Sequence, residues 1–190
     1  MRHSSHLRSC LVVLLLLGAC EDAEQQAAKP APQELTREAI SHYCNMIVAD
    51  HHGPKAQLFL KDSDVPIWFS SVRDAIAFTR LPDEPKSVAA IYVNDMARAT
   101  WETPEPGTWI EAEGAHYVIE SDRRGGMGAR EAVPFADMSA AEAFVAAHGG
   151  QIFAFAEVPE AYVLSAEPDM TLHGIPETNQ IGEMSHDHGD

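Results

Sequence analysis

The sequence predicts an α+β protein made of two small, mostly antiparallel sheets, each covered by one helix. Two stretches, about residues 55–96 and 109–158, carry the same order of elements: two short β-prone runs, a helical run and a closing β-prone run. Each helical run starts at a serine that is followed three residues later by an acidic residue, which is the pattern of a capping box. Apolar residues make up 45% of the chain, enough for an ordinary core. We therefore expect two β-β-α-β pseudo-repeats whose helices pack on their sheets.

The first of these blocks alternates β-prone runs with strong turn and helix signals. Asp62-Ser63-Asp64 is a turn signal between its first two runs. Ser71 and Asp74 form the expected capping box, and Pro82 and Pro85 end the helix. The predicted strands are 55–61, 65–69 and 88–93.

The second block repeats this order after a polar connection. Its helix is predicted over 140–147, with Ser139 and Glu142 as the capping box and Gly149-Gly150 as the stop. Before it, a glycine-rich turn over 121–128 separates two β-prone runs, and the second run ends in Val133-Pro134-Phe135. The predicted strands are 109–111, 116–120, 131–135 and 151–156.

The N-terminus indicates an exported lipoprotein. Arg2 and Arg8 precede a short apolar run that ends in Leu17-Gly18-Ala19-Cys20, which looks like a bacterial lipobox. We expect residues 1–19 to be a signal peptide, Cys20 to carry the lipid, and residues 20–36 to form a flexible tether. This places the protein on the periplasmic side of a bacterial membrane, with the outer membrane favoured over the inner. Ordinary secretion without lipid on Cys20 is the alternative.

The mature chain would be strongly acidic. Removal of Arg2 and Arg8 leaves 11 of the 13 Lys and Arg residues against 29 Asp and Glu residues, a net charge of −18. Such a surface repels nucleic acid and anionic head groups, and it attracts cations and basic protein patches. We expect a monomer. Residues 167–190 contain Met170, His173 and Met184, and we expect a disordered tail that is either inert or a weak metal collector.

Cys44 is the candidate centre of the site. Cys10 leaves with the signal peptide and Cys20 is lipidated, so Cys44 is the one free thiol of the mature chain. A thiol two residues from Met46, with His42 on its other side, suits a soft metal ion such as Cu(I). On a helix, side chains two residues apart diverge by about 200°, so a chelating pair requires a strand or loop. The alternatives are a buried, inert Cys44 and a Met46 that packs in the core.

The second candidate sulfur is Met127, which lies in Gly125-Gly126-Met127-Gly128. A large apolar side chain among glycines has no local packing partners, so delivery of a thioether to a metal is a reasonable alternative to packing. Three histidines could add a nitrogen ligand: His42, His51 and His116. The alternatives are an exposed turn for His51 and a hydrogen-bonded structural role for His116. The site would then be built between the two blocks.

These features together resemble the NosL family of periplasmic lipoproteins. The resemblance rests on the lipobox, Cys44-Asn45-Met46, the Met127-Gly128 to Val133-Pro134-Phe135 stretch and the two blocks. It implies a fold similar to that of organomercurial lyase over residues 37–166. It also implies a Cu(I) chaperone that serves the copper-sulfur centre of nitrous oxide reductase together with an ABC-type membrane complex. By motif, the cysteine ligand falls on Cys44, a methionine ligand on Met127, and Met46 completes a Cys-x-Met signature. The middle position is often glycine in the family, and Asn45 tolerates the left-handed backbone that glycine adopts.

Two other functions compete with the metallochaperone. The lyase-like fold suggests a thiol-dependent enzyme, with Cys44 as nucleophile and His42 as its helper. A single thiol speaks against it, since carbon–mercury cleavage is expected to use more than one cysteine. The other competitor is a lipoprotein that binds no metal, in which Cys44 is incidental or pairs two protomers.

Overall fold

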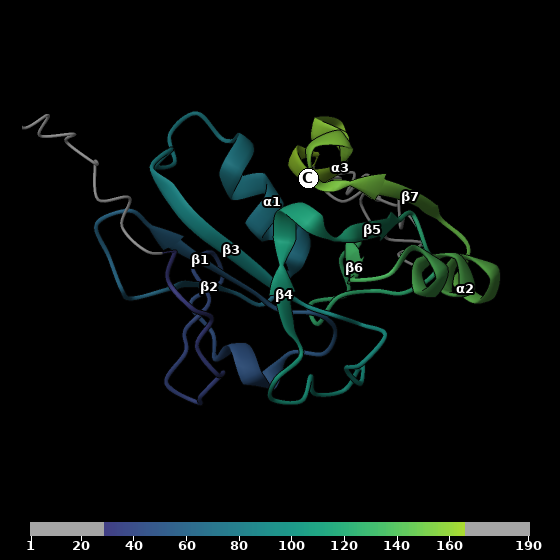
Figure 1. Ribbon diagram of the computed structural model, residues 1–190, viewed down its shortest axis with the longest axis horizontal. Coiled ribbons are helices and arrows are strands. Elements are labelled where there is room, and N and C mark those ends of the chain that lie inside the picture. Colours follow the sequence, from purple (N-terminus) through teal and green to yellow (C-terminus); the bar gives the residue numbers. More distant parts are fainter. Residues whose placement is uncertain (1–28, 166–190) are drawn as a thin grey trace, which may run out of the picture.

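The computed structural model describes residues 29–165, and its elements follow the predicted order in both blocks (Figure 1). The strands are β1 (Ala56–Leu60), β2 (Ile67–Phe69), β3 (Val88–Asn94), β4 (Trp109–Glu111), β5 (His116–Ile119), β6 (Val133–Phe135) and β7 (Gln151–Ala154). The helices are α1 (Val72–Arg80), α2 (Met138–His148) and α3 (Glu160–Leu164), and 3-10 turns occupy Val48–Asp50, Ala112–Gly114 and Phe155–Glu157. The signal peptide, Cys20 and the tail over 167–190 lie outside the described residues. Within residues 29–165, no helix has the length and apolar character needed to cross a bilayer.

The two blocks arrange their strands in the same order. The first sheet runs β2-β1-β3-β4 and the second β6-β5-β7, and every neighbouring pair is antiparallel. In each sheet the first strand of the block lies between the second strand and the closing strand. The helix connects the second strand to the closing strand in both blocks. The predicted α+β fold with small antiparallel sheets is confirmed.

One strand belongs to a different sheet from the one expected. Trp109–Glu111 forms β4 but pairs with β3, through Asn94 opposite Trp109 and Tyr92 opposite Glu111. The prediction that residues 109–111 start the second block was therefore wrong. Figure 1 shows β4 crossing from the end of the first sheet toward β5. The physical reason is that β3 offers a free edge, which β4 covers.

The main core is shared by both halves and is organised around α1. Phe78, Ile76 and Val72 are fully buried on α1. They belong to one cluster with strand residues of the first sheet and with Tyr117, Ile119, Val158 and Tyr162 of the second half. α3 lies against α1, where the Arg73 side chain donates hydrogen bonds to the carbonyls of Tyr162 and Ser165 at 3.0 and 2.5 Å. The first turn of α1 is therefore held by the C-terminal end of the described chain.

A smaller cluster lies under α2. Ala141 is the one buried residue of this helix. Phe144 packs against Phe135, with 5.1 Å between the two ring centroids. Val118 and Val133 complete the buried part of this cluster. The second sheet is thus covered by a helix as predicted, with much less buried surface than the first.

The described C-terminal part of the predicted tether is bound to the first sheet. Residues 29–33 lie against the outer face of the first sheet, where Tyr92 donates a hydrogen bond to the Pro30 carbonyl at 2.6 Å. Gln33 and the fully buried Gln57 exchange two hydrogen bonds of 2.8 and 2.9 Å. Lys29 forms an ion pair with Glu111 at 2.8 Å. This segment satisfies polar groups of the sheet, which its polar and Pro-rich composition did not indicate.

Candidate metal centre

Cys44 lies at the tip of a tight loop that precedes the first sheet. The Ser41 amide donates to the Met46 carbonyl at 2.9 Å, and the Asn45 amide donates to the Ser41 carbonyl at 3.0 Å. Ile40 and Ile47 form an isolated antiparallel bridge at the base of the loop. Asn45 has φ = 55°, in the left-handed region, so the expectation for this residue is confirmed. The segment is a loop, as chelation by Cys44 and Met46 requires.

The Cys44 thiol is half-buried and surrounded by hydroxyl groups. Its Sγ lies 3.7 Å from Oγ of Ser70, at the end of β2. Burial alone would raise the pKa of this thiol. Hydrogen bonds from the Ser41 hydroxyl, the Met46 amide and the Ser70 hydroxyl outweigh burial and lower the pKa below its ordinary value. The surroundings therefore favour the thiolate, which is the metal-binding form.

Both candidate methionines lie at the surface. The Met46 side chain is 41% exposed and that of Met127 is 60% exposed. Met46 is therefore not part of the core, which removes the packing alternative for this residue. Met127 lies in a turn closed by hydrogen bonds from the Gly125 amide to the Ala129 carbonyl at 2.9 Å and from Gly128 to Gly125 at 2.8 Å. Neither thioether is engaged in packing that would prevent it from binding a metal.

The loop that carries Met127 rests on the segment that follows the Cys44 loop. A Cβ atom placed on Gly126 would lie 2.5 Å from Cβ of His51 and 2.8 Å from the amide nitrogen of His52. Glycine is thus required at 126 because backbone from the first half passes directly beneath it. This contact brings a loop of the second block against His51 and His52 of the first block.

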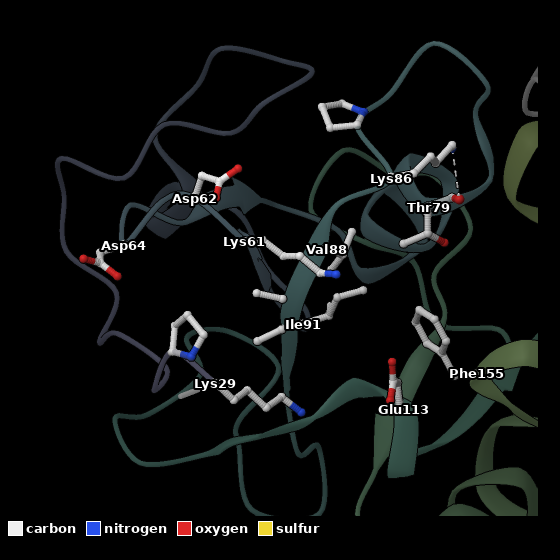
Figure 2. A pocket seen from close by; sticks show the side chains of 14 residues that line it. Lys29, Lys61, Asp62, Asp64, Thr79, Lys86, Val88, Ile91, Glu113 and Phe155 are labelled. Carbon is white, nitrogen blue, oxygen red and sulfur yellow. Dashed lines mark hydrogen bonds between the residues drawn. The ribbon is translucent and has the colours of Figure 1, made fainter. Parts of the chain in front are cut away.

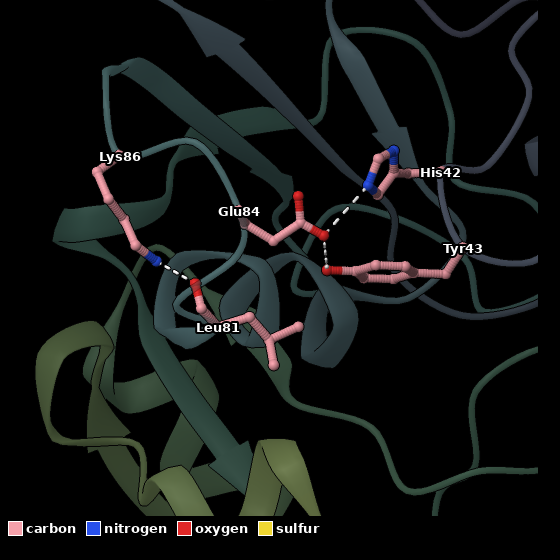
Figure 3. Close-up of polar contacts among 5 residues, drawn as sticks. All are labelled: His42, Tyr43, Leu81, Glu84 and Lys86. Carbon is pink, nitrogen blue, oxygen red and sulfur yellow. Dashed lines mark hydrogen bonds and ion pairs between the residues drawn. The ribbon is translucent and has the colours of Figure 1, made fainter.

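The three candidate histidines are in different situations. His42 is placed by Glu84, which accepts a hydrogen bond from Tyr43 at 2.9 Å and lies 3.4 Å from Nε2 of His42 (Figure 3). His51 is 8% exposed, and its Nε2 has no hydrogen-bond partner among the described residues. His116 lies in β5, opposite Phe135 and Ala154. His51 is the histidine with a buried nitrogen left unused next to the Met127 loop.

Sequence reasoning missed two buried charged residues beneath this loop. Glu131 is 1% exposed, and burial is the main cause that raises its pKa to about 7. Lys55 is also 1% exposed, and burial lowers its pKa to about 8, while the nearby Glu131 acts in the opposite direction. Lys55 donates hydrogen bonds to the carbonyls of His52 and Gly53 at 3.0 and 2.5 Å. The available signal was a lone acidic residue at the head of the apolar run 132–135.

Glu131 also replaces the capping box predicted for α1. Ser71 occupies the N-cap position but makes no side-chain bond to its own helix. Its hydroxyl instead donates to Oε1 of Glu131 at 3.1 Å, and the Arg73 amide donates to the same oxygen at 3.0 Å. The capping box at Ser139 was also wrong, because α2 begins at Met138 with Asp137 as its N-cap. In α1, a residue from the second half takes over the capping role.

The rest of the chain between residues 29 and 165 offers no competing cluster. Within residues 29–165, no three His, Cys, Asp or Glu side chains gather in a way that would hold a metal ion. A groove of about 990 Å³ lies beside β3 and is lined by Lys29, Lys61 and Lys86 together with acidic and apolar residues (Figure 2). None of the candidate ligands lines this groove. The candidate site therefore depends on one thiol and on thioether sulfur.

Comparison with known proteins agrees with this fold and identifies the family of the chain. The NosL family model matches residues 32–163. The chain is 50% identical to the copper-binding lipoprotein NosL of Achromobacter cycloclastes over 165 residues, which is 85% of this chain and 84% of the relative. It is 34% identical to the copper-binding lipoprotein NosL of Stutzerimonas stutzeri over 158 residues, 82% of each chain.

A solved structure is similar as well. The crystal structure of the copper chaperone NosL from Shewanella denitrificans superimposes with a TM-score of 0.65 at 31% identity. The match covers 69% of this chain and 97% of the other. Together with the family model, these relatives show that the chain belongs to the NosL family.

Proposed function

We propose that this protein is a periplasmic Cu(I) metallochaperone, anchored by a lipid on Cys20, that delivers copper for assembly of the copper-sulfur centre of nitrous oxide reductase. The relatives are named copper-binding lipoproteins and a copper chaperone, which supports copper handling by this chain. The receiver is the reductase itself, its ABC-type maturation complex, or both.

The observation that carries this proposal is the state of the Cys44 thiol. It lies on a surface loop, half-buried, with hydroxyl and amide donors that lower its pKa. A thiolate and an exposed thioether two residues apart on one loop, at Cys44 and Met46, are the kinds of ligand that Cu(I) prefers over harder donors. The same thiolate would be a poor choice for a purely structural role, because nothing in its surroundings packs it as a core residue.

The ligand set that we propose is Cys44 and Met127, with Met46 or His51 as the third donor. His51 is supported by its unused, buried Nε2 and by its contact with the Met127 loop. His42 has weaker support because Glu84 already holds its Nε2. His116 has the weakest support because it lies within the second sheet.

Few soft ligands on surface loops suit a protein that must release its metal. Ligand exchange needs an open position, whereas a closed site of four thiolates holds its ion. One thiol and an open site also fit a carrier better than an enzyme. Turnover of an organomercurial by the purified protein would instead support the thiol-dependent enzyme.

Anaerobic titration with Cu(I) against a competing chelator tests the binding proposal. The mature chain should carry Cys20→Ser so that Cys44 is its only thiol. We expect one Cu(I) per chain, loss of binding by about two orders of magnitude or more in Cys44→Ala, and a smaller loss in Met127→Ala and Met46→Ala. Met138→Ala is the matched control, since Met138 is 45% exposed at the start of α2, a helix that packs on the second sheet. Wild-type affinity in Cys44→Ala would contradict the proposal.

Transfer to the receiver is a separate test. The copper-loaded protein is mixed with copper-free nitrous oxide reductase, and the copper content of the reductase is measured after the two are separated. We expect transfer from the wild type and none from Cys44→Ala. Retention of all copper by the wild type, in the presence of the reductase and of the maturation complex, would contradict delivery.

A further inference from the structure

We propose that Glu131 is a positioning residue that sets the placement of the Met127 loop relative to the Cys44 loop. This inference rests on the proposed function, in which the two loops supply the sulfur ligands of one Cu(I). It assigns the residue a role through its contacts with the Met127 loop and with the start of α1, to which the Cys44 loop is attached, and not through contact with the metal.

One carboxylate oxygen of Glu131 is fully occupied. Oε1 accepts hydrogen bonds from the Ser71 hydroxyl at 3.1 Å, the Arg73 amide at 3.0 Å and the Ala132 amide at 2.9 Å. Two of these donors belong to the first turn of α1 and its N-cap. The side chain is thereby fixed in one orientation at the start of α1.

The other oxygen faces the Met127 loop. Oε2 is buried and has no hydrogen-bond partner among the described residues. A Cβ atom placed on Gly125 would lie 2.7 Å from this oxygen, so the backbone of the loop rests directly on it. A buried polar oxygen left without a donor is unfavourable, and groups of this kind call for an explanation in function or strain. Here we infer that the oxygen fixes the position of the loop, because Gly125 packs directly against it.

The start of α1 also holds the Cys44 loop. Ser70 precedes the N-cap residue Ser71, and its amide donates to Oγ of Ser41 at 3.2 Å. The Ser70 hydroxyl lies 3.2 Å from that same oxygen and 3.7 Å from Sγ of Cys44. The Cys44 loop and Glu131 are therefore both attached to residues 70–73. A shift of Glu131 moves the Met127 loop and leaves the Cys44 loop in place.

A pair of compensating substitutions tests this arrangement. Gly125→Ala places a methyl group against Oε2 of Glu131. The backbone of Gly125 is outside the left-handed region, so the added contact is the main effect of this substitution. Glu131→Asp shortens the side chain by one methylene and withdraws the oxygen from the loop. We expect Gly125→Ala to weaken Cu(I) binding about tenfold, which is typical for residues that orient ligands, and Gly125→Ala with Glu131→Asp to recover most of it. Gly114→Ala is the control, because a Cβ there meets no atom within 4 Å.

A second readout needs no copper. In the copper-free protein, the methyl NMR resonance of Met127 should shift in Gly125→Ala and return toward its wild-type position in the double variant, while the Met46 resonance stays unchanged. Glu131→Gln keeps the length of the side chain and should leave the Met127 resonance near its wild-type position. A merely structural role of Glu131 would lower stability without this paired shift and return.

The outcomes separate the two proposals. If Gly125→Ala leaves the Met127 resonance and the Cu(I) affinity unchanged, or if the double variant restores neither, the role of Glu131 is overturned. If Cys44→Ala retains wild-type affinity, the proposed function fails, and the Met127 resonance alone then decides the role of Glu131. Should Glu131→Asp fail to fold, as judged by circular dichroism, Gly125→Ala alone decides through the same resonance.

Discussion

The two halves of the molecule share an order of elements but differ in how deeply their helices are buried. α1 buries Val72, Arg73, Ala75, Ile76, Ala77 and Phe78, whereas α2 buries Ala141 alone. α1 packs into a core shared with the second half, and α2 covers only a small cluster. The larger buried core thus lies around α1, and the second half adds the loop that carries Met127.

The two site loops differ in the same way. The Cys44 loop is bonded to the first sheet, with the His42 amide donating to the Trp68 carbonyl at 2.8 Å. The Met127 loop comprises residues 125–129, its described backbone hydrogen bonds are internal, and Gly125 and Gly126 lie against neighbouring segments. Regions with few buried contacts open at lower free energy than the core. The Cys44 thiol therefore lies on a loop that is fixed to the sheet, whereas the Met127 thioether lies on a less constrained loop.

The contrast between the helices predicts the largest effect on stability. Phe78→Ala should lower the free energy of unfolding by about 3–5 kcal/mol, because Phe78 is fully buried in the shared core. Phe144→Ala on the half-buried side of α2 should lower it by about half as much. Urea denaturation of the two variants measures both. Equal losses would show that the two halves contribute equally.

Glu131, at the boundary of the halves, predicts a pH dependence. Its pKa is raised from 4.5 to about 7, so the folded state keeps a proton that the unfolded state has lost. The stability from this group is complete below pH 4.5 and is lost as the pH rises through 7. Glu131→Gln cannot ionise, and we expect it to gain up to about 3 kcal/mol relative to wild type between pH 4.5 and 8. Parallel stability curves for the two proteins would contradict this.

The anchoring of the Cys44 loop predicts a change in thiol chemistry. Ser70→Ala removes a hydroxyl that favours the thiolate, so the pKa of Cys44 should rise toward its ordinary value. The pH dependence of alkylation by iodoacetamide reports this pKa. The loss of stability should be about 1 kcal/mol. Ser87→Ala, at an exposed serine, is the control and should leave the alkylation profile unchanged.

The smallest effect is expected at the rim of the Cys44 loop. Tyr43→Phe removes the hydrogen bond from the Tyr43 hydroxyl to Glu84. Burial is the main cause that raises the pKa of this hydroxyl, and the hydrogen bond to Glu84 is the second. Because Tyr43 is 40% exposed, we expect a loss near 0.5 kcal/mol and an unchanged Cu(I) affinity. Thermal unfolding and the Cu(I) titration measure the two quantities. A large loss of affinity would move the site toward Glu84 and His42.

Local patterns predicted much of this fold. The β-prone runs, the Gly149-Gly150 stop and the left-handed Asn45 were all readable because each depends on neighbouring residues. The partner of β4 and the caps of α1 and α2 were not, because pairing and capping depend on residues that only the folded chain brings together. Ser71 carries the letters of a capping box, yet its hydroxyl bonds to a residue 60 positions away.

The ligands of the candidate site stay predictions, and the structure adds only where each of them lies. Cys44 and Met127 were identifiable from a lone thiol and from a methionine among glycines. The contacts of Gly126 with His51 and of Gly125 with Glu131 could not be predicted from the sequence, because they depend on how the folded chain packs. The position of each candidate sulfur on its loop was predictable, and the support beneath it was not.

The remote cap of α1 has a consequence for how the protein is made. Synthesis proceeds from the N-terminus, so Cys44 and α1 leave the ribosome before Glu131 exists. Until that glutamate arrives, the Arg73 amide and the Ser71 hydroxyl lack their acceptor, and closing the long intervening loop is entropically unfavourable. The N-terminal cap of α1 is therefore completed late, when the second half docks. A chain truncated before Glu131 would leave the first turn of α1, which directly follows Ser70, without its acceptor.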